Sequence, residues 1–148
     1  MRLMKGTMPP NHDIGLTHVA LMATNPDASI AFYEKYAAMQ VVHRRVDAST
    51  NHTVVWLSDR TRPFVIVLIE ADKVDMPLGP FAHLGVGCRS REEVERLCRE
   101  AASDGCLHSG PEDSGYPVGY WAFLSDPDGN TLEISYGQEI ALTVAKSH

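Results

Sequence analysis

Two stretches of the chain have the alternating pattern of a β-strand and carry a histidine near the start of that pattern. The first is Gly15–Leu21, which contains His18, and the second is Phe81–Gly87, which contains His83. Because successive side chains of a strand point to opposite faces, each histidine is separated from the larger apolar residues of its strand. The pattern predicts two strands with a buried apolar face and an open face that bears the histidine.

A helix signal follows each predicted strand. Asn25 and Pro26 provide a cap residue followed by proline at the first helical position, and Ser90–Glu93 forms a capping box. Gly105 is a typical residue for the end of the second helix. The apolar faces of the two expected helices consist of Ile30, Tyr33, Tyr36 and Ala37 in the first, and of Val94, Leu97, Cys98 and Ala101 in the second.

Three short strand patterns follow each helix, so the two halves of the chain repeat one another. The expected strands are Gln40–Val46, Thr53–Ser58 and Phe64–Ala71 in the first half, and Cys106–Ser109, Val118–Ser125 and Thr131–Gly137 in the second. The tetrapeptide Trp56–Asp59 also matches Phe123–Asp126. Because one such unit cannot bury both faces of its sheet, the repeat predicts an α+β fold of two βαβββ modules that pack together.

These patterns place the domain at residues 14–138, with modules at about 14–71 and 80–138. The segment Asp72–Pro80 is rich in charge and proline and is expected to link the modules. Residues 1–13 lack an apolar secretory signal and are expected to form a flexible leader.

Composition excludes several classes of partner. The 148 residues suit one compact domain, and no apolar run is long enough to cross a bilayer. The formal net charge is −6 and there is no basic stripe, which argues against nucleic acids and anionic membranes as partners. The three cysteines include no CxxC pair, so they predict neither a disulfide framework nor a zinc–thiolate site, and they indicate a cytoplasmic protein.

Three segments of the sequence resemble the vicinal oxygen chelate superfamily, which includes glyoxalases, extradiol dioxygenases, methylmalonyl-CoA epimerases, fosfomycin-resistance transferases and bleomycin-binding proteins. The segments that carry the resemblance are Gly15–Ala20, Ala82–Val86 and Phe123–Ile134, within a similarity that spans about Leu16–Gln138. The resemblance implies two βαβββ modules whose curved sheets form a half-open β-barrel cup, with helices outside. It also implies a homodimer, and in some members of the superfamily the cup forms between two chains.

The resemblance further implies a metal site made by His18, His83 and Glu133. Two imidazoles and one carboxylate suit Fe²⁺, and also Ni²⁺, Zn²⁺ or Mn²⁺. Three protein ligands leave coordination positions for substrate oxygens or water, as in catalytic metal sites. The ligand set is therefore expected to hold one divalent metal ion in a β-sheet cup.

The sequence also departs from particular branches of the superfamily. The fourth ligand of glyoxalases and epimerases falls near Ile66 or Val67, and both are apolar here. Ala20 replaces the threonine of fosfomycin transferases, and Phe123 replaces a tyrosine of both the transferases and the extradiol enzymes. The extradiol pattern has a histidine shortly before that tyrosine, and Ser114–Tyr116 has none.

Further residues are candidates for the substrate site. The expected pocket consists of Trp56, Val67, Trp121 and Phe123, which strand alternation places on the inner face. Tyr116 and Tyr120, at a glycine- and proline-rich loop, are candidate proton donors. Arg44 and Arg45 are weaker candidates for binding a substrate carboxylate.

The predicted function is metal-assisted chemistry on a small-molecule substrate that presents two adjacent oxygens. The two-histidine, one-carboxylate set slightly favours an Fe(II) dioxygenase. A glyoxalase-type lyase or isomerase is the enzymatic alternative. A drug- or metabolite-binding protein of the bleomycin-resistance type is the non-catalytic alternative.

Overall fold

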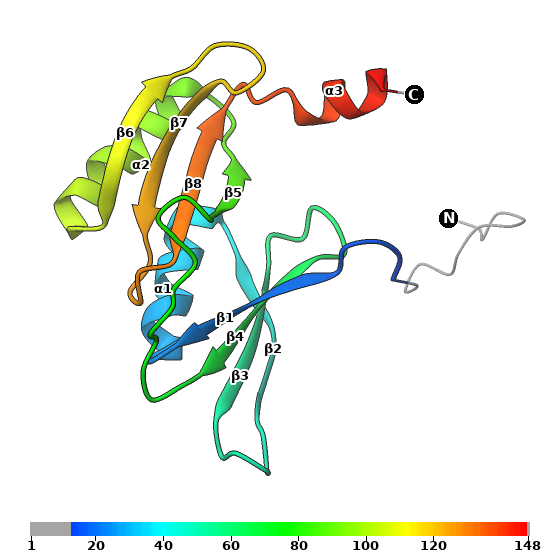
Figure 1. Cartoon of the computed structure of the whole chain (residues 1–148), viewed down its shortest axis with the longest axis vertical. Coiled ribbons are helices and arrows are strands. Elements are labelled where there is room, and N and C mark those ends of the chain that lie inside the picture. The colour runs from blue at the N-terminus through cyan, green and yellow to red at the C-terminus, as the bar shows by residue number, and fades with distance from the viewer. Residues whose placement is uncertain (1–12, 148) are drawn as a thin grey trace, which may run out of the picture.

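The computed structural model describes residues 13–147 and consists of two βαβββ modules followed by a short helix (Figure 1). The first module contains β1 (His18–Ala23), α1 (Pro26–Ala37), β2 (Gln40–Val46), β3 (Thr53–Ser58) and β4 (Val65–Glu70). The second contains β5 (Leu84–Gly87), α2 (Arg91–Asp104), β6 (Leu107–Asp113), β7 (Tyr120–Ser125) and β8 (Thr131–Tyr136), and α3 (Ile140–Lys146) follows. The predicted α+β fold of two modules is confirmed. The expected leader, except for Asp13, lies outside the described residues.

The helix signals of the sequence act as predicted. The Asn25 side chain accepts a hydrogen bond from the backbone N–H of Ala28, with an N···O distance of 3.2 Å. The Ser90 hydroxyl accepts one from the N–H of Glu93 at 3.0 Å. Gly105 ends α2 with φ 78°, a left-handed conformation that glycine adopts without steric cost.

Several element boundaries differ from the sequence-based expectation. The pairing of β5 with β8 begins at Leu84, so His83 lies just before the strand. Strand β6 extends to Asp113, and α3 was not predicted.

No helix within residues 13–147 has the length and apolar character needed to cross a membrane.

The eight strands form two separate sheets with the same topology. Their orders are β1-β4-β3-β2 and β5-β8-β7-β6, with β1 parallel to β4 and β5 parallel to β8. No strand of one module pairs with a strand of the other among the described residues. Each sheet therefore remains open, and neither closes a barrel by itself.

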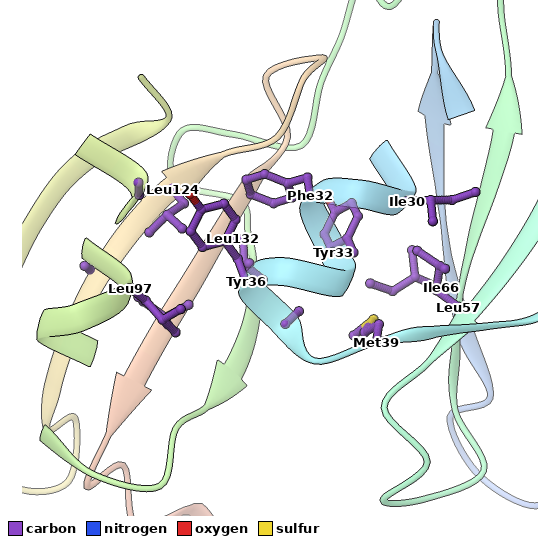
Figure 2. Close-up of a cluster of buried hydrophobic side chains, with 14 of the residues drawn as sticks. Ile30, Phe32, Tyr33, Tyr36, Met39, Leu57, Ile66, Leu97, Leu124 and Leu132 are labelled. Atoms are coloured by element: carbon purple, nitrogen blue, oxygen red, sulfur yellow. The ribbon is translucent and has the colours of Figure 1, made fainter. Parts of the chain in front are cut away.

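Helix α1 lies between the two sheets and joins them in one core. Figure 2 shows its aromatic side chains between Leu57 and Ile66 of the first sheet and Leu124 and Leu132 of the second. Tyr33 is fully buried in this cluster. Both sheets therefore direct their helix-facing sides into the same core, and their other faces point away from it.

The turn between β7 and β8 connects the second module to the first through hydrogen bonds. The buried Tyr33 hydroxyl donates a hydrogen bond to the Asp126 carboxylate at 2.8 Å. Thr24, next to the end of β1, donates to Asp128 from its backbone N–H at 3.1 Å and from its hydroxyl at 2.6 Å. Asn130 accepts a bond from the backbone N–H of Leu78 in the linker at 2.8 Å. The turn holds α1, β1 and the linker together.

Replacing Tyr33 with phenylalanine should weaken this junction. The change leaves the ring in the core but removes a buried donor from Asp126, which is only 5% exposed. We expect the free energy of unfolding to fall by about 1–3 kcal/mol, measured by urea denaturation. Tyr116→Phe is the matched control, because Tyr116 is 66% exposed and should change stability by less than ~0.5 kcal/mol. Equal stability of the two variants would show that the Tyr33–Asp126 bond does not stabilise the fold.

Candidate metal and substrate site

The open face of the first sheet carries His18 beside a cavity of about 570 Å³. Ala20 on β1 pairs with Val67 on β4, and Val67 pairs with Trp56 on β3, so these residues form a row next to His18. The His18 Nδ1 atom lies 2.9 Å from the Thr17 hydroxyl, which leaves Nε2 unengaged within the described residues. His18, Trp56 and Val67 all line the cavity.

The open face of the second sheet brings His83 and Glu133 together. His83 Nε2 lies 3.9 Å from Glu133 Oε1, which is beyond hydrogen-bonding distance. His83 Nδ1 lies 2.5 Å from the Phe81 carbonyl oxygen, an arrangement in which Nδ1–H donates and Nε2 keeps its lone pair. Imidazoles that ligate metals are commonly oriented in this way. The imidazole and the carboxylate have the chemistry of two ligands that could bind the same metal ion.

The Glu133 carboxylate is buried but accessible from the side of β5. It is 7% exposed, and Oε2 accepts a hydrogen bond from the Gln138 side-chain amide at 2.8 Å. Gly85 is the strand partner of Glu133, and a Cβ built on it would lie 3.5 Å from Oε2. A glycine at this position leaves the carboxylate uncovered. Gln138 was not predicted, since nothing in its sequence context marks an amide that orients a ligand.

One chain does not assemble all three predicted ligands. No group of three His, Cys, Asp or Glu side chains within residues 13–147 is close enough to share a metal ion. His18 lies on the first sheet, whereas His83 and Glu133 lie on the second. Because the opposite faces of both sheets pack into the common core, the face with His18 and the face with His83 and Glu133 both lie on the sides turned away from that core.

The predicted pocket residues divide between the same two faces. Trp56 and Val67 accompany His18, and the Trp56 ring lies 5.0 Å from the ring of His43. Phe123 lies 4.9 Å from both the His83 ring and the Trp121 ring, measured between centroids. The open face of each sheet thus combines a histidine with neighbouring aromatic side chains.

The two tyrosines proposed as proton donors lie in different surroundings, Tyr120 on the helix-facing side of β7 and Tyr116 in an exposed loop. Tyr120 is buried on the helix-facing side of β7, where its hydroxyl donates to Glu95 at 3.0 Å and the Arg91 guanidinium stacks on its ring at 3.8 Å. Burial, followed by the bond to Glu95, raises the pKa of Tyr120. Tyr116 is exposed in the loop between β6 and β7. These positions give no support to a role for Tyr120 in proton transfer at Glu133.

Arg44 and Arg45 are neighbours on β2, so strand alternation directs their side chains to opposite faces of the sheet. Arg44 forms an ion pair with Asp27 at 2.9 Å, near the start of α1. Arg45 lines the His18 cavity, together with Arg60 and Arg62 from the loop between β3 and β4. The sequence pattern did not indicate the last two, because they lie in a loop outside the repeating strands.

The cysteines have the environment expected of structural thiols. All three are free, and Cys98 is buried on α2. Burial raises the pKa of the Cys88 thiol to about 11, and it also raises the pKa values of Cys98 and Cys106. Thiols with raised pKa values are poor nucleophiles and poor metal ligands at neutral pH.

Comparison with known proteins decides the family. The family model of the Glyoxalase/Bleomycin resistance protein/Dioxygenase superfamily matches residues 15–134. The chain belongs to this superfamily. It is 38% identical over 128 residues to the uncharacterized protein PA2024 of Pseudomonas aeruginosa, covering 84% of this chain and 90% of that protein.

Solved structures of other superfamily proteins have the same fold. A possible glyoxalase from Bacillus cereus matches with a TM-score of 0.65 and 22% identity, covering 83% of this chain and 99% of that one. A mutant of the fosfomycin resistance protein FosX from Listeria monocytogenes, in complex with Mn(II) and 1S,2S-dihydroxypropylphosphonic acid, matches with a TM-score of 0.69 and 15% identity. That match covers 91% of this chain and 100% of the other. At these identities the likeness establishes the fold, and the substrate has to be argued from this chain's own residues.

The strand register shows which of the two candidate residues on β4, Ile66 or Val67, lies on the open face. Val67 and Glu133 are equivalent, because Val67 pairs with Ala20 and Trp56 as Glu133 pairs with Gly85 and Phe123. Val67 therefore lies on the open face, where it lines the cavity although it is only 9% exposed, whereas its neighbour Ile66 is 2% exposed and belongs to the core cluster. The first module presents an apolar side chain where the second presents a carboxylate.

Glutamate substitutions on β4 should separate these two faces. In Val67→Glu the carboxylate can extend into the cavity, and we expect a loss of less than ~2 kcal/mol in the free energy of unfolding. In Ile66→Glu the charge enters the core, and we expect a loss of several kcal/mol, about 3 or more, or failure to fold. Urea denaturation measures both. Similar losses would show that β4 does not present Val67 to the cavity.

Proposed function

We propose that the protein is a divalent-metal-dependent enzyme whose active site forms between two copies of the chain. His83 and Glu133 of one chain and His18 of the other would hold the metal. The observation that supports this most directly is the pair formed by His83 and Glu133, in which an imidazole lone pair and a buried carboxylate face one another at 3.9 Å. The proposed site calls for a homodimer because His18 of the same chain lies on the other sheet.

The open face of the first sheet has exposed apolar side chains, which supports the proposal that a second chain packs on this face. Met22 is 49% exposed and Trp56 is 39% exposed, both on the side that carries His18. Val42 lines the same cavity and is also exposed. Large apolar residues clustered on an open sheet commonly mark an interface. Placing the second sheet of a partner over this face would bring His18 of one chain to His83 and Glu133 of the other.

The donor set fits a divalent metal ion. It contains two imidazoles and one carboxylate, and each imidazole has its Nδ1 engaged, by Thr17 or by the Phe81 carbonyl. Gln138 fixes the Glu133 carboxylate from the side. These contacts hold the ligand side chains in defined rotamers before any metal binds, which reduces the entropy lost on binding.

A divalent cation at this site would act as a Lewis acid on two adjacent oxygens of a small substrate. The chain's own residues would supply the surroundings. Trp56 and Val67 of one chain, with Trp121 and Phe123 of the other, would form apolar walls that bind the body of the substrate and exclude water. With Val67 in the fourth ligand position, the protein would provide three ligands and leave room for both substrate oxygens.

The ligand set suits Fe(II) as well as Mn(II), Ni(II) or Zn(II), so both an Fe(II) dioxygenase and a glyoxalase-type lyase or isomerase are compatible with it. The neighbouring residues do not strengthen the dioxygenase interpretation. Phe123 beside His83 has no hydroxyl, and the Tyr120 hydroxyl is bonded to Glu95. We therefore propose Lewis-acid chemistry as the function. Oxygen consumption by the Fe(II)-loaded protein with a catechol would instead establish a dioxygenase.

A mixed dimer provides the sharpest test of a site shared between chains. His18→Ala and Glu133→Ala should each abolish most metal binding, whereas His43→Ala, which removes a histidine from the same face as Trp56, should not. Two differently tagged variants, His18→Ala and Glu133→Ala, are then coexpressed and the mixed dimer is purified. It contains one complete site, so it should recover about half of the wild-type metal content per chain, measured by elemental analysis.

Each other result has a defined meaning. A mixed dimer without metal, when the wild type binds metal, would place all three ligands within one chain. Full occupancy in all three ligand variants, His18→Ala, His83→Ala and Glu133→Ala, would refute the site. A wild-type protein that binds no divalent metal would favour the drug- or metabolite-binding alternative.

A further inference from the structure

We infer that the substrate carries an anionic group, a carboxylate or a phosphonate, which Arg60 and Arg62 bind at the His18 cavity. This inference rests on the proposed function and names its substrate class. Both residues line the cavity that contains His18, Trp56 and Val67. The same cavity would therefore contact the anionic group, the apolar body and the metal-binding end of one small molecule.

The cavity is positive although the protein is negative. The formal net charge of the chain is −6. The cavity lining contains three arginines, Arg45, Arg60 and Arg62, and one carboxylate, Asp13, which together leave a formal charge of +2. A local excess of positive charge in a concave site attracts anions and raises their local concentration.

Two of the three arginines lack an acidic partner within the described residues. Arg45 is paired with Asp47, its Nε lying 2.9 Å from the carboxylate. Neither Arg60 nor Arg62 forms an ion pair within residues 13–147, where the acidic Asp59 beside Arg60 instead accepts bonds from Thr61. Their charges remain available to a ligand.

The loop that carries Arg60 holds the side chain in place at a conformational cost. Arg60 has φ 62°, a left-handed conformation that residues other than glycine, asparagine and aspartate rarely adopt. The Ser58 hydroxyl accepts the Arg60 backbone N–H at 2.9 Å, and the Gln40 side chain accepts its Nε–H at 2.8 Å. The Nε contact orients the guanidinium and leaves its terminal N–H groups free for the parallel bonds that carboxylates and phosphonates accept.

Glycine is the residue that this backbone position favours on steric grounds, so an arginine here points to a function of the side chain. The variant Arg60→Gly should consequently keep or raise the melting temperature while it weakens anion binding. A residue that served only the fold would show the opposite behaviour.

Two matched probes test the inference. 3,4-Dihydroxybenzoate and 3,4-dihydroxybenzamide have the same adjacent oxygens and the same ring, and only the first is an anion. Calorimetric titration of the wild type should show tighter binding of the benzoate by about tenfold or more, as expected of charge-assisted hydrogen bonds. The double variant Arg60→Gly/Arg62→Ala should bind the two probes equally. Arg99→Ala, which removes an exposed arginine of α2, should keep the preference.

Titrations with and without Mn(II) separate this inference from the proposed metal site. If the metal site is wrong, Mn(II) will not bind, but the metal-free protein will still prefer the benzoate. If the inference is wrong, the wild type will bind both probes equally, or the double variant will keep the preference. A double variant that loses the dimer in sedimentation would also overturn the inference, because the arginines would then serve the interface.

Benzoate and phenylphosphonate, compared directly, identify which anionic group the arginines prefer, and tighter binding of either over benzamide supports the inference.

Discussion

The common core built around α1 is the constraint on which the other features of the protein depend. Both sheets direct their apolar sides into it, with Leu57 and Ile66 on one side of the helix and Leu124 and Leu132 on the other. Strand alternation then forces the polar and ligand-bearing sides of both sheets outward. His18 is thereby separated from His83 and Glu133. Packing of the two sheets on α1, rather than the chemistry of these three side chains, decides where they lie in one chain.

The turn from Asp126 to Asn130 connects this packing to the site. Its residues carry much of the sequence resemblance, and their role in the structure is to hold the two modules together. Asp126 accepts a hydrogen bond from the Tyr33 hydroxyl, and Asp128 accepts one from the backbone N–H of Thr24. Glu133 follows the turn directly on β8, so the same contacts that dock the modules also fix the register of the ligand strand. This explains why a segment rich in turn residues stands directly before the strand that carries Glu133.

The two modules have diverged in the use of equivalent positions. Val67 stands where Glu133 stands in the other module, and Trp56 where Phe123 stands. In both modules a Ser-Asp pair ends the third strand, and its aspartate organises the following turn, through Thr61 at Asp59 and through Asp128 at Asp126. In the first module that turn presents Arg60 to the cavity. In the second module the equivalent turn joins the two modules through hydrogen bonds. At these equivalent positions the first module presents apolar and arginine side chains to a cavity, and the second presents a carboxylate.

The sequence by itself determined the two modules, the caps of both helices and the strand faces on which His18 and Glu133 lie, because these follow from local periodicity and capping chemistry. It placed His83 inside a strand, although pairing with β8 begins only at Leu84. The separation of His18 from His83 and Glu133, the burial of Tyr120 under α2 and the position of Arg60 and Arg62 in the cavity were decided only by the tertiary structure. Each depends on how sheets, helix and loops far apart in the chain pack together, and a periodic pattern does not record which way two packed units face.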